Sequence, residues 1–236
     1  MKKSDAKQAR AEFDAPPTSG IITTVDSVLL TVHEQQLKVA LFPREHDPFA
    51  GQATLSGRYL RTTDKNALFA AAHSLKEKTG IVTPYLEQLY TFSGPDRDPR
   101  GYSVSIAHYA LVPCQLILDA APAGMELRSV DDRRKLPFDH SDIVAMAVSR
   151  VRNKSQYSSL PLYLAPEKFS QTELQRIYEH VMGTTLPKAQ FRRKLAEMDV
   201  LEETGEQEQG VAHKPAWLYR LKPGIGMELS LLKRGL

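Results

Sequence analysis

The pattern of strand-like and helix-like segments in this 236-residue chain changes character near residue 152. Before that point, segments rich in β-branched and apolar residues alternate with helical patterns, as in an α+β domain. Residues 153–168, NKSQYSSLPLYLAPEK, contain two prolines and no long periodic run, which is typical of a domain boundary. Two short helical patterns and a hairpin follow. The sequence therefore predicts domains at residues 19–152 and 169–236, joined by a linker at 153–168.

The composition is that of an ordinary globular protein, with 42% hydrophobic and 25% charged residues. A net charge of +3 permits nucleic-acid binding without predicting it. The single cysteine, Cys114, excludes an intrachain disulfide and fits a reducing compartment. Residues 1–18 are polar, with no apolar run behind the lysines, and are expected to form a disordered tail rather than a secretory signal. No apolar stretch approaches the about 20 residues that span a bilayer, so we expect a cytoplasmic protein without membrane contact.

Strand-like segments make up much of the first domain. Residues 22–32 and 37–45 flank the polar stretch HEQQ, which predicts a hairpin. Residues 85–93 and 102–112 predict two further strands, the second with clear alternation. The segment at 51–62, GQATLSGRYLRT, is open between strand and loop.

Two helical patterns accompany these strands. The first covers residues 65–79 and is stopped by Gly80. Its apolar side is expected to consist of Leu68, Ala71, Ala72, Leu75 and, less strongly, Thr79. The second covers residues 141–152 and is amphipathic. Its apolar side is expected to consist of Ile143, Met146, Ala147 and Val151.

The segment from Gly57 to Ile81 resembles the Nudix box, G-x5-E-x7-R-E-U-x-E-E-x-G-U, in which U is apolar. The resemblance covers roughly residues 21–150. It implies an α/β/α sandwich with a mixed sheet. Read back from the final glycine, the pattern finds an apolar residue, one glutamate and three replacements at its key positions: Leu75, Glu77, and then Lys78, His73 and Ser74 where a glutamate, an arginine and a glutamate are usual.

These replacements bear directly on catalysis. Nudix hydrolysis needs magnesium ions that bridge a pyrophosphate and activate water, so several carboxylates must converge on one helix face. Ser74, Glu77 and Lys78 lie on neighbouring faces of one turn, but a serine, one glutamate and a lysine cannot hold two divalent ions. The resemblance therefore implies a Nudix domain without catalytic residues, metal or cofactor. An ordinary solvated amphipathic helix remains the alternative.

The segment GPDRDPRGYSVSIAHYALV, residues 94–112, is similar to the turn and strand of ADP-ribose-type Nudix domains. Its two arginines carry donor forks that suit phosphate or ribose oxygens, although loop arginines are usually solvated. Its first tyrosine is a candidate for stacking on a base, with a place in the core or at the rim as the alternative. The resemblance thus nominates five ligand-binding residues: Arg58 at the box turn, Glu77, Arg97, Arg100 and Tyr102.

LPFDHSDIV, residues 136–144, is similar to the start of the last helix in the same group of proteins. Phe138 is expected to serve packing. Asp139 is expected to cap the helix through its side chain, and His140 to be structural rather than catalytic.

The second domain has the order helix, turn, helix, hairpin, which is typical of a winged helix-turn-helix. Ser170 and Glu173 form a capping-box pair, and Gly183 closes that helix. The inward side is expected to contain Leu174, Ile177, Tyr178 and Val181. Pro187 opens a second helix, whose apolar side is expected to contain Phe191, Leu195 and Met198.

The second helix also carries a basic side, which favours DNA binding because phosphates attract cations and Arg or Gln side chains match base edges. The wing, GEQEQGVAHKPAWLYRL, is acidic at its tip and basic at its exit. A merely solvated basic face is the alternative, and the acidic tip weakens the DNA interpretation. The predicted DNA-binding residues are Lys188, Gln190, Arg192, Arg193, Lys194, His213 and Lys214.

Together the two halves resemble the Nudix-related transcriptional regulators of bacteria. That resemblance implies a homodimeric repressor on palindromic double-stranded DNA, with a nucleotide-type effector such as ADP-ribose and with genes of NAD metabolism or sugar utilisation as targets. Two alternatives stay open. One is a pyrophosphohydrolase that acts on ADP-ribose or a related nucleoside diphosphate derivative through Glu77 and Asp64, with Glu87 or Asp98 brought in. The other is a protein-interaction module whose basic helix meets an acidic partner.

Overall fold

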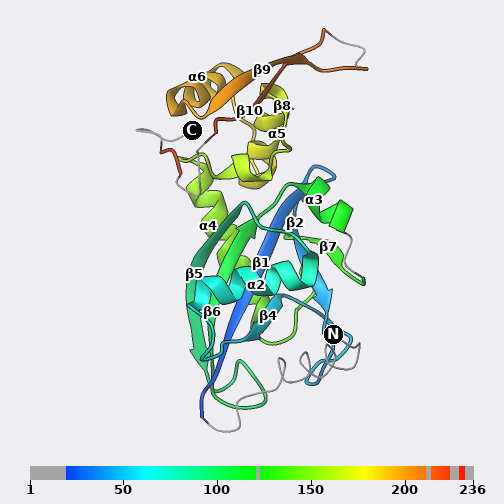
Figure 1. Cartoon of the computed structure of the whole chain (residues 1–236), viewed down its shortest axis with the longest axis vertical. Coiled ribbons are helices and arrows are strands. Elements are labelled where there is room, and N and C mark those ends of the chain that lie inside the picture. The colour runs from blue at the N-terminus through cyan, green and yellow to red at the C-terminus, as the bar shows by residue number, and fades with distance from the viewer. Residues whose placement is uncertain (1–19, 121–122, 211–213, 224–228, 232–236) are drawn as a thin grey trace.

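The computed structural model describes residues 20–120, 123–210, 214–223 and 229–231, which form two units stacked along the long axis of the molecule (Figure 1). The predicted tail at residues 1–18 and the predicted DNA-binding residue His213 lie outside the described residues. No helix within those ranges combines the length and the apolarity that crossing a bilayer requires.

The larger unit is built on a seven-stranded mixed sheet with the order β3-β2-β1-β6-β5, in which β4 also pairs with β1 and β7 with β2. β1 runs parallel to β6 and antiparallel to β2 and β4. The strands are β1 (Ile22–His33), β2 (Gln36–Pro43), β3 (Ala53–Thr54), β4 (Ser56–Tyr59), β5 (Tyr85–Gly94), β6 (Ser103–Leu111) and β7 (Glu126–Ser129). The predicted first hairpin is confirmed. Its two turn residues, Glu34 and Gln35, both have positive φ, as a type I′ turn requires.

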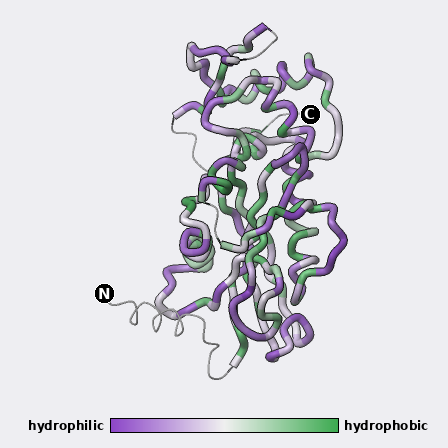
Figure 2. Tube along the Cα trace, turned by 90° about the vertical axis from the view of Figure 1, so that its right-hand side faces the viewer, coloured by the Kyte–Doolittle hydropathy of each residue, from purple (hydrophilic) through white to green (hydrophobic). Residues whose placement is uncertain are grey.

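Helices cover both faces of this sheet, and the hydrophobic stretches gather between the layers (Figure 2). α2 (Ala67–Thr79) lies on one face, and α4 (His140–Ser155) lies on the other. α2 begins where the Asn66 side chain accepts the amide of Phe69, and it ends at Gly80 with φ of 74°. Two residues expected to be buried on α2, Leu68 and Ala72, are exposed. The buried side instead consists of Ala70, Ala71, Ser74, Leu75 and Thr79.

α4 is longer at both ends than predicted, and its buried residues include Ile143, Ala147 and Val151 as expected. Met146 is only partly buried. A short helix, α3 (Cys114–Ala120), and the edge strand β7 were not predicted.

The smaller unit is a winged helix-turn-helix. α5 (Gln171–Met182) and α6 (Lys188–Met198) stand beside a three-stranded sheet of β8 (Phe169–Ser170), β10 (Trp217–Leu221) and β9 (Leu201–Gln207). The capping prediction is confirmed, because the Ser170 side chain accepts the amide of Glu173 and Gly183 adopts φ of 70°. The predicted buried residues of both helices are all buried.

The two units share one continuous core. The segment that sequence patterns assign to a linker contains the end of α4 and a 3-10 helix, η1 (Leu160–Leu164), whose five residues are all buried. One apolar cluster runs from the sheet face under α4 through η1 into α5 and α6. The small unit is therefore packed onto the large one through α4 and η1 and through direct contacts of α5 with β1 and β2.

Candidate functional site

The predicted ligand-binding residues lie on different faces of the sheet. β4 pairs with residues 24–27 of β1, and successive side chains of β4 point to opposite faces of the sheet. Arg58 points to the α2 side, where it contacts His73 of α2. The next residue, Tyr59, points to the α4 side, where it meets Arg100.

Under α2, Arg58 is buried and paired. Its guanidinium donates to the Asp64 carboxylate and lies 3.1 Å from His73 Nδ1. His73 Nδ1 in turn lies 3.3 Å from Glu77 Oε2 on the half-exposed outer side of α2. Burial raises the pKa of the Asp64 carboxyl, but the hydrogen bonds from Arg58 and from the Arg61 amide, together with the charges of both arginines, leave the pKa below its usual value. The Arg58 guanidinium thus pairs with the Asp64 carboxylate and is linked through His73 to Glu77.

The residues present under α2 do not fit the magnesium that the Nudix fold implies. Ser74, at a glutamate position of the box, is buried, and its hydroxyl lies 3.2 Å from that of Ser56. Lys78 extends over the Phe42 ring at 6.0 Å. Among the described residues, no group of three or more His, Cys, Asp or Glu side chains is arranged to hold a metal ion.

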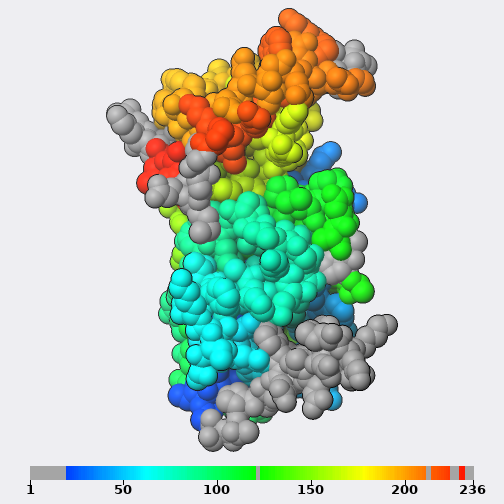
Figure 3. Space-filling model, viewed as in Figure 1, coloured from blue at the N-terminus to red at the C-terminus, as the bar shows by residue number. Residues whose placement is uncertain are grey.

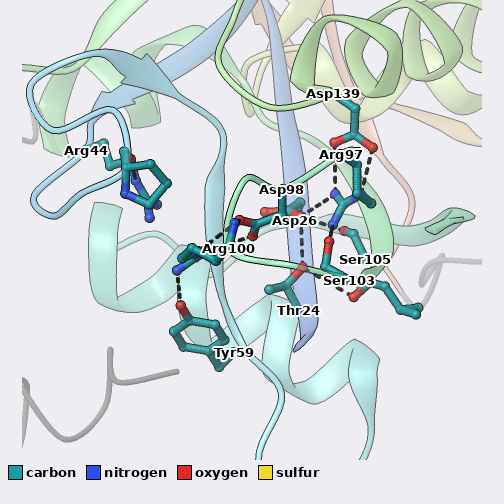
Figure 4. Close-up of polar contacts among 12 residues, drawn as sticks. Thr24, Asp26, Arg44, Tyr59, Arg97, Asp98, Arg100, Ser103, Ser105 and Asp139 are labelled. Carbon is teal, nitrogen blue, oxygen red and sulfur yellow. Dashed lines mark hydrogen bonds and ion pairs between the residues drawn. The ribbon is translucent and has the colours of Figure 1, made fainter. Parts of the chain in front are cut away.

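On the α4 side, a polar cluster is centred on the buried carboxylate of Asp26 (Figure 4). It accepts hydrogen bonds from Ser105 Oγ at 2.6 Å and from Thr24 Oγ1 at 3.2 Å. A Cβ atom at Gly57 would lie 2.1 Å from Asp26 Oδ1. The first glycine of the Nudix-like segment is therefore required by this carboxylate.

Arg97 is held inside this cluster rather than presented to solvent. Its Nε and Nη2 donate to the two oxygens of Asp139 at 2.8 Å each, and its Nη1 donates to Ser103 Oγ at 3.0 Å. The expected side-chain cap at Asp139 is wrong, because this carboxylate accepts Arg97 instead of an α4 amide. A bidentate guanidinium offers two charge-assisted bonds, which no single backbone amide can match.

His140 is structural, as expected. It is buried, and its Nδ1 accepts the amide of Leu55 at 3.2 Å. Burial lowers the pKa of His140, although the nearby Asp26 opposes this shift. The neutral imidazole is the form that accepts the Leu55 amide.

Arg100 lies at the open side of the cluster. Its Nε and Nη2 donate to Asp98 at 2.9 and 2.6 Å, and its Nη1 contacts the hydroxyl of Tyr59. Burial raises the pKa of the Asp98 carboxyl, but the bonds from Arg100 bring it below its usual value. Arg100 also lies 5.9 Å from the centre of the Phe138 ring.

Arg44 is the member of the site that sequence reasoning missed. It follows β2, its Nε donates to the carbonyl of Pro48 at 2.5 Å, and its guanidinium lies 4.9 Å from the centre of the Phe138 ring. No carboxylate pairs with it in the part of the chain that the structure describes. Burial and the charge of Arg100 lower its pKa. A half-buried cation beside a second cation is a favourable place for an anion. Nothing in the local sequence FPRE, residues 42–45, indicates this role.

The structure therefore brings Arg97 and Arg100 together with Arg44 and Tyr59, and it separates them from Arg58. Glu77 is on the exposed outer side of α2. Tyr102 is half exposed, and its carbonyl accepts the amide of Ile22 at the start of β1.

The basic side of α6 is largely accessible. Lys188, Arg192 and Arg193 are exposed, and Gln190 is partly so. Lys194 differs, since its side chain is buried and lies 3.4 Å from Glu197 Oε2. Lys214 is exposed at the exit of the wing.

The acidic wing projects from the end of the molecule far from the large sheet (Figure 3). One glutamate of the wing, Glu206, lies 2.6 Å from Lys168. Two further glutamates of β9, just ahead of the wing, also have partners: Glu202 with Arg220 at 2.5 Å and Glu203 with the Tyr219 hydroxyl at 2.9 Å. Exposed pairs of this kind contribute little stability, but the Lys168 pair places a positive charge beside the Glu206 carboxylate of the wing. The wing is less repulsive to phosphates than its sequence suggests.

Comparison with known proteins agrees with this geometry. The NrtR DNA-binding winged helix domain matches residues 161–221. The ADPR responsive transcriptional repressor NtrR of Acinetobacter baylyi is 36% identical over 220 residues, which cover 91% of this chain and 86% of that protein. The crystal structure of Shewanella oneidensis NrtR complexed with a 27mer DNA superimposes with a TM-score of 0.84 at 35% identity, over 91% of this chain and 99% of that one. The Nudix domain of the same protein complexed with ADP ribose matches 64% of this chain and 99% of that one, with 34% identity and a TM-score of 0.51.

Proposed function

The chain belongs to the family of NrtR-type regulators, in which a Nudix domain is joined to a winged helix, and from this membership we infer that it is a DNA-binding transcriptional repressor that responds to ADP-ribose. The observation that carries this inference is the 36% identity to an ADPR responsive repressor along 91% of the chain, through both units. The DNA and ADP-ribose complexes of the Shewanella protein support the two ligands.

The Nudix unit of this chain is proposed to be a sensor without hydrolase activity. The support is local: Ser74 bonds Ser56 where a metal-binding carboxylate is usual, and the Arg58 guanidinium holds Asp64. A site built in this way lacks the converging oxygens that magnesium needs. We expect no AMP from ADP-ribose in the presence of Mg²⁺. Release of AMP that is lost in Glu77→Gln would instead establish the hydrolase.

We propose that the effector pyrophosphate binds at Arg44 and Arg100, with Tyr59 beside them. Arg44 forms no ion pair with a described carboxylate, and guanidinium forks match phosphate oxygens. Arg97 is proposed to position the Asp139 end of α4 rather than to touch the ligand, because its side chain is 8% exposed and each of its three guanidinium nitrogens donates to Asp139 or Ser103. Roles for Arg58 and Tyr102 in direct contact lack such support.

For DNA, the proposed contacts are the accessible residues of α6, Lys188, Gln190, Arg192 and Arg193, with Lys214 at the wing. Lys194 is proposed to stabilise α6 instead, since it is buried beside Glu197. The chain is proposed to act as a homodimer on a palindromic operator, because paired winged helices read two half-sites related by symmetry.

The first experiment is selection of genomic DNA fragments by the purified protein at near-physiological salt. Wild type should enrich a palindromic site, ADP-ribose should release it, and Arg192→Ala/Arg193→Ala should abolish enrichment. A contact to guanine is worth about 1–3 kcal/mol, whereas loss of a phosphate contact lowers the salt slope by about 1.

The matched control is Arg133→Ala/Arg134→Ala, which removes the same charge from exposed positions before α4. Equal losses in both double variants would indicate nonspecific attraction, and no enrichment by folded wild type would overturn the repressor assignment.

A further inference from the structure

Phe138 has an unusual backbone. Its φ is +57°, a left-handed conformation in which a bulky side chain is strained. It lies directly before Asp139 and the first turn of α4. Such a conformation persists only when its surroundings hold it in place, so the contacts of the ring identify what holds it.

Four side chains hold the ring, and one of them is the His140 imidazole, whose centroid lies 5.2 Å away. Phe49, itself at φ +71°, packs edge-to-face against it with centroids 4.9 Å apart. The guanidinium groups of Arg44 and Arg100 lie 4.9 and 5.9 Å from its centroid. Cation–π attraction therefore ties Phe138 to the same two arginines that make up the proposed effector site.

The other side of Phe138 leads to the DNA-binding unit. The neighbouring Asp139 carboxylate is gripped by Arg97, and α4 begins at His140. At its far end α4 contacts η1 and α5, and these elements share one apolar cluster. Because a packed helix moves as a unit, a shift at Phe138 is passed to the support of α6 rather than absorbed locally.

We propose that Phe138 couples effector binding to DNA release, an inference that rests on the function proposed above. Phosphate oxygens that engage Arg44 and Arg100 draw the guanidinium groups from the ring. Phe138 then leaves its strained conformation, and the start of α4 moves with it. ADP-ribose in this way binds the two conformations unequally, which is what coupling between two sites requires.

Phe138→Leu tests the proposal, because it removes the π face and keeps an apolar side chain. DNA affinity should be measured with and without ADP-ribose by fluorescence anisotropy, and ADP-ribose affinity by calorimetry. In the wild type ADP-ribose should weaken DNA binding by about 5–150-fold, the usual range of coupling. In Phe138→Leu this factor should fall towards one. ADP-ribose should bind at least as tightly as in the wild type, since no cation–π contact opposes it. A merely structural role would weaken ADP-ribose binding instead.

Two further variants complete the test. Phe92→Leu, the matched control, makes the same substitution at a partly buried phenylalanine of β5 that packs against the core under α4, and it should keep full coupling. Phe138→Gly also lacks the ring, but glycine adopts positive φ without strain. In Phe138→Gly, too, ADP-ribose should no longer weaken DNA binding. This variant replaces Phe138→Leu in the test if Phe138→Leu does not fold. Full coupling in a folded Phe138 variant would overturn the proposal. If ADP-ribose does not weaken DNA binding by the wild type, the proposed function itself fails.

Discussion

Gly57 lies where the site tolerates no side chain. Asp26 Oδ1 would be 2.1 Å from a Cβ atom there, and Asp26 is fixed by Ser105 and Thr24. Gly57→Ala is expected to lower the free energy of unfolding by about 1–3 kcal/mol, the usual cost of overpacking. Urea denaturation would measure it. The double variant Asp26→Ala/Gly57→Ala should lose less stability than the two single variants lose together, because it lacks the carboxylate with which the new Cβ atom clashes. Simple additivity would show that Asp26 is not the obstacle.

Two buried histidines set the acid side of the stability curve. Burial lowers the pKa of both His108 and His140, and His108 Nε2 has no hydrogen-bond partner among the described residues. Histidines of the unfolded chain have a pKa of about 6.5. Below that pH the unfolded chain therefore binds more protons than the folded chain. Stability from this source is complete above that pH and is lost as the pH falls below it.

The melting temperature is accordingly expected to decline as the pH falls from 7.5 to 5.5, before the carboxylates titrate. His108→Gln should make this decline shallower, because it removes one of the two groups. A decline of equal steepness in His108→Gln would show that His108 does not contribute.

At the scale of elements, the caps of α5 show how far local sequence determines structure. The Ser170 hydroxyl accepts the amide of Glu173. Ser170→Ala is expected to destabilise the protein by about 0.5–2 kcal/mol. The control is Ser149→Ala in the exposed middle of α4, where alanine is the better helix former. Thermal unfolding of both variants would decide. Equal melting temperatures would mean that the cap is dispensable.

The caps of α5, the Glu34–Gln35 turn and the apolar sides of α5 and α6 could all be predicted, because each depends on residues close in sequence. The absence of a side-chain cap at Asp139 could not, because Arg97 accounts for that carboxylate. The sheet order could not, since β1 pairs with β6 some 80 residues away. The same limit applies to the site. Arg97 was chosen for a ligand, yet it bonds Asp139, 42 residues on. Arg44 was missed because only the fold brings it to Phe138.

At the scale of the whole molecule, the continuous core through η1 predicts a single unfolding transition. Trp217, the one tryptophan of the chain, reports on the winged helix, and far-UV circular dichroism reports on both units. Their urea midpoints should coincide. A lower midpoint for Trp217 fluorescence would mean that the small unit unfolds independently.

Leu162→Ala in η1 provides a check, because Leu162 is 2% exposed. It should lower both midpoints together, at a cost of about 2–5 kcal/mol. Leu118→Ala on α3, where the side chain is 44% exposed, is the control and should change neither by much. A shift of one midpoint alone would contradict a shared core.

The buried η1 segment also determines how this protein can be recombined with others. A biosensor built by attaching a different sensor to this winged helix cannot be spliced at residues 153–168, because that junction cuts through the shared interior. The fusion point should lie before α4, in the stretch at residues 131–135, so that α4 and η1 stay with the winged helix. The incoming sensor would then have to supply a sheet face that matches α4. Exchange of the sensor therefore requires a replacement that also matches η1 and α5, which contact the sheet as well.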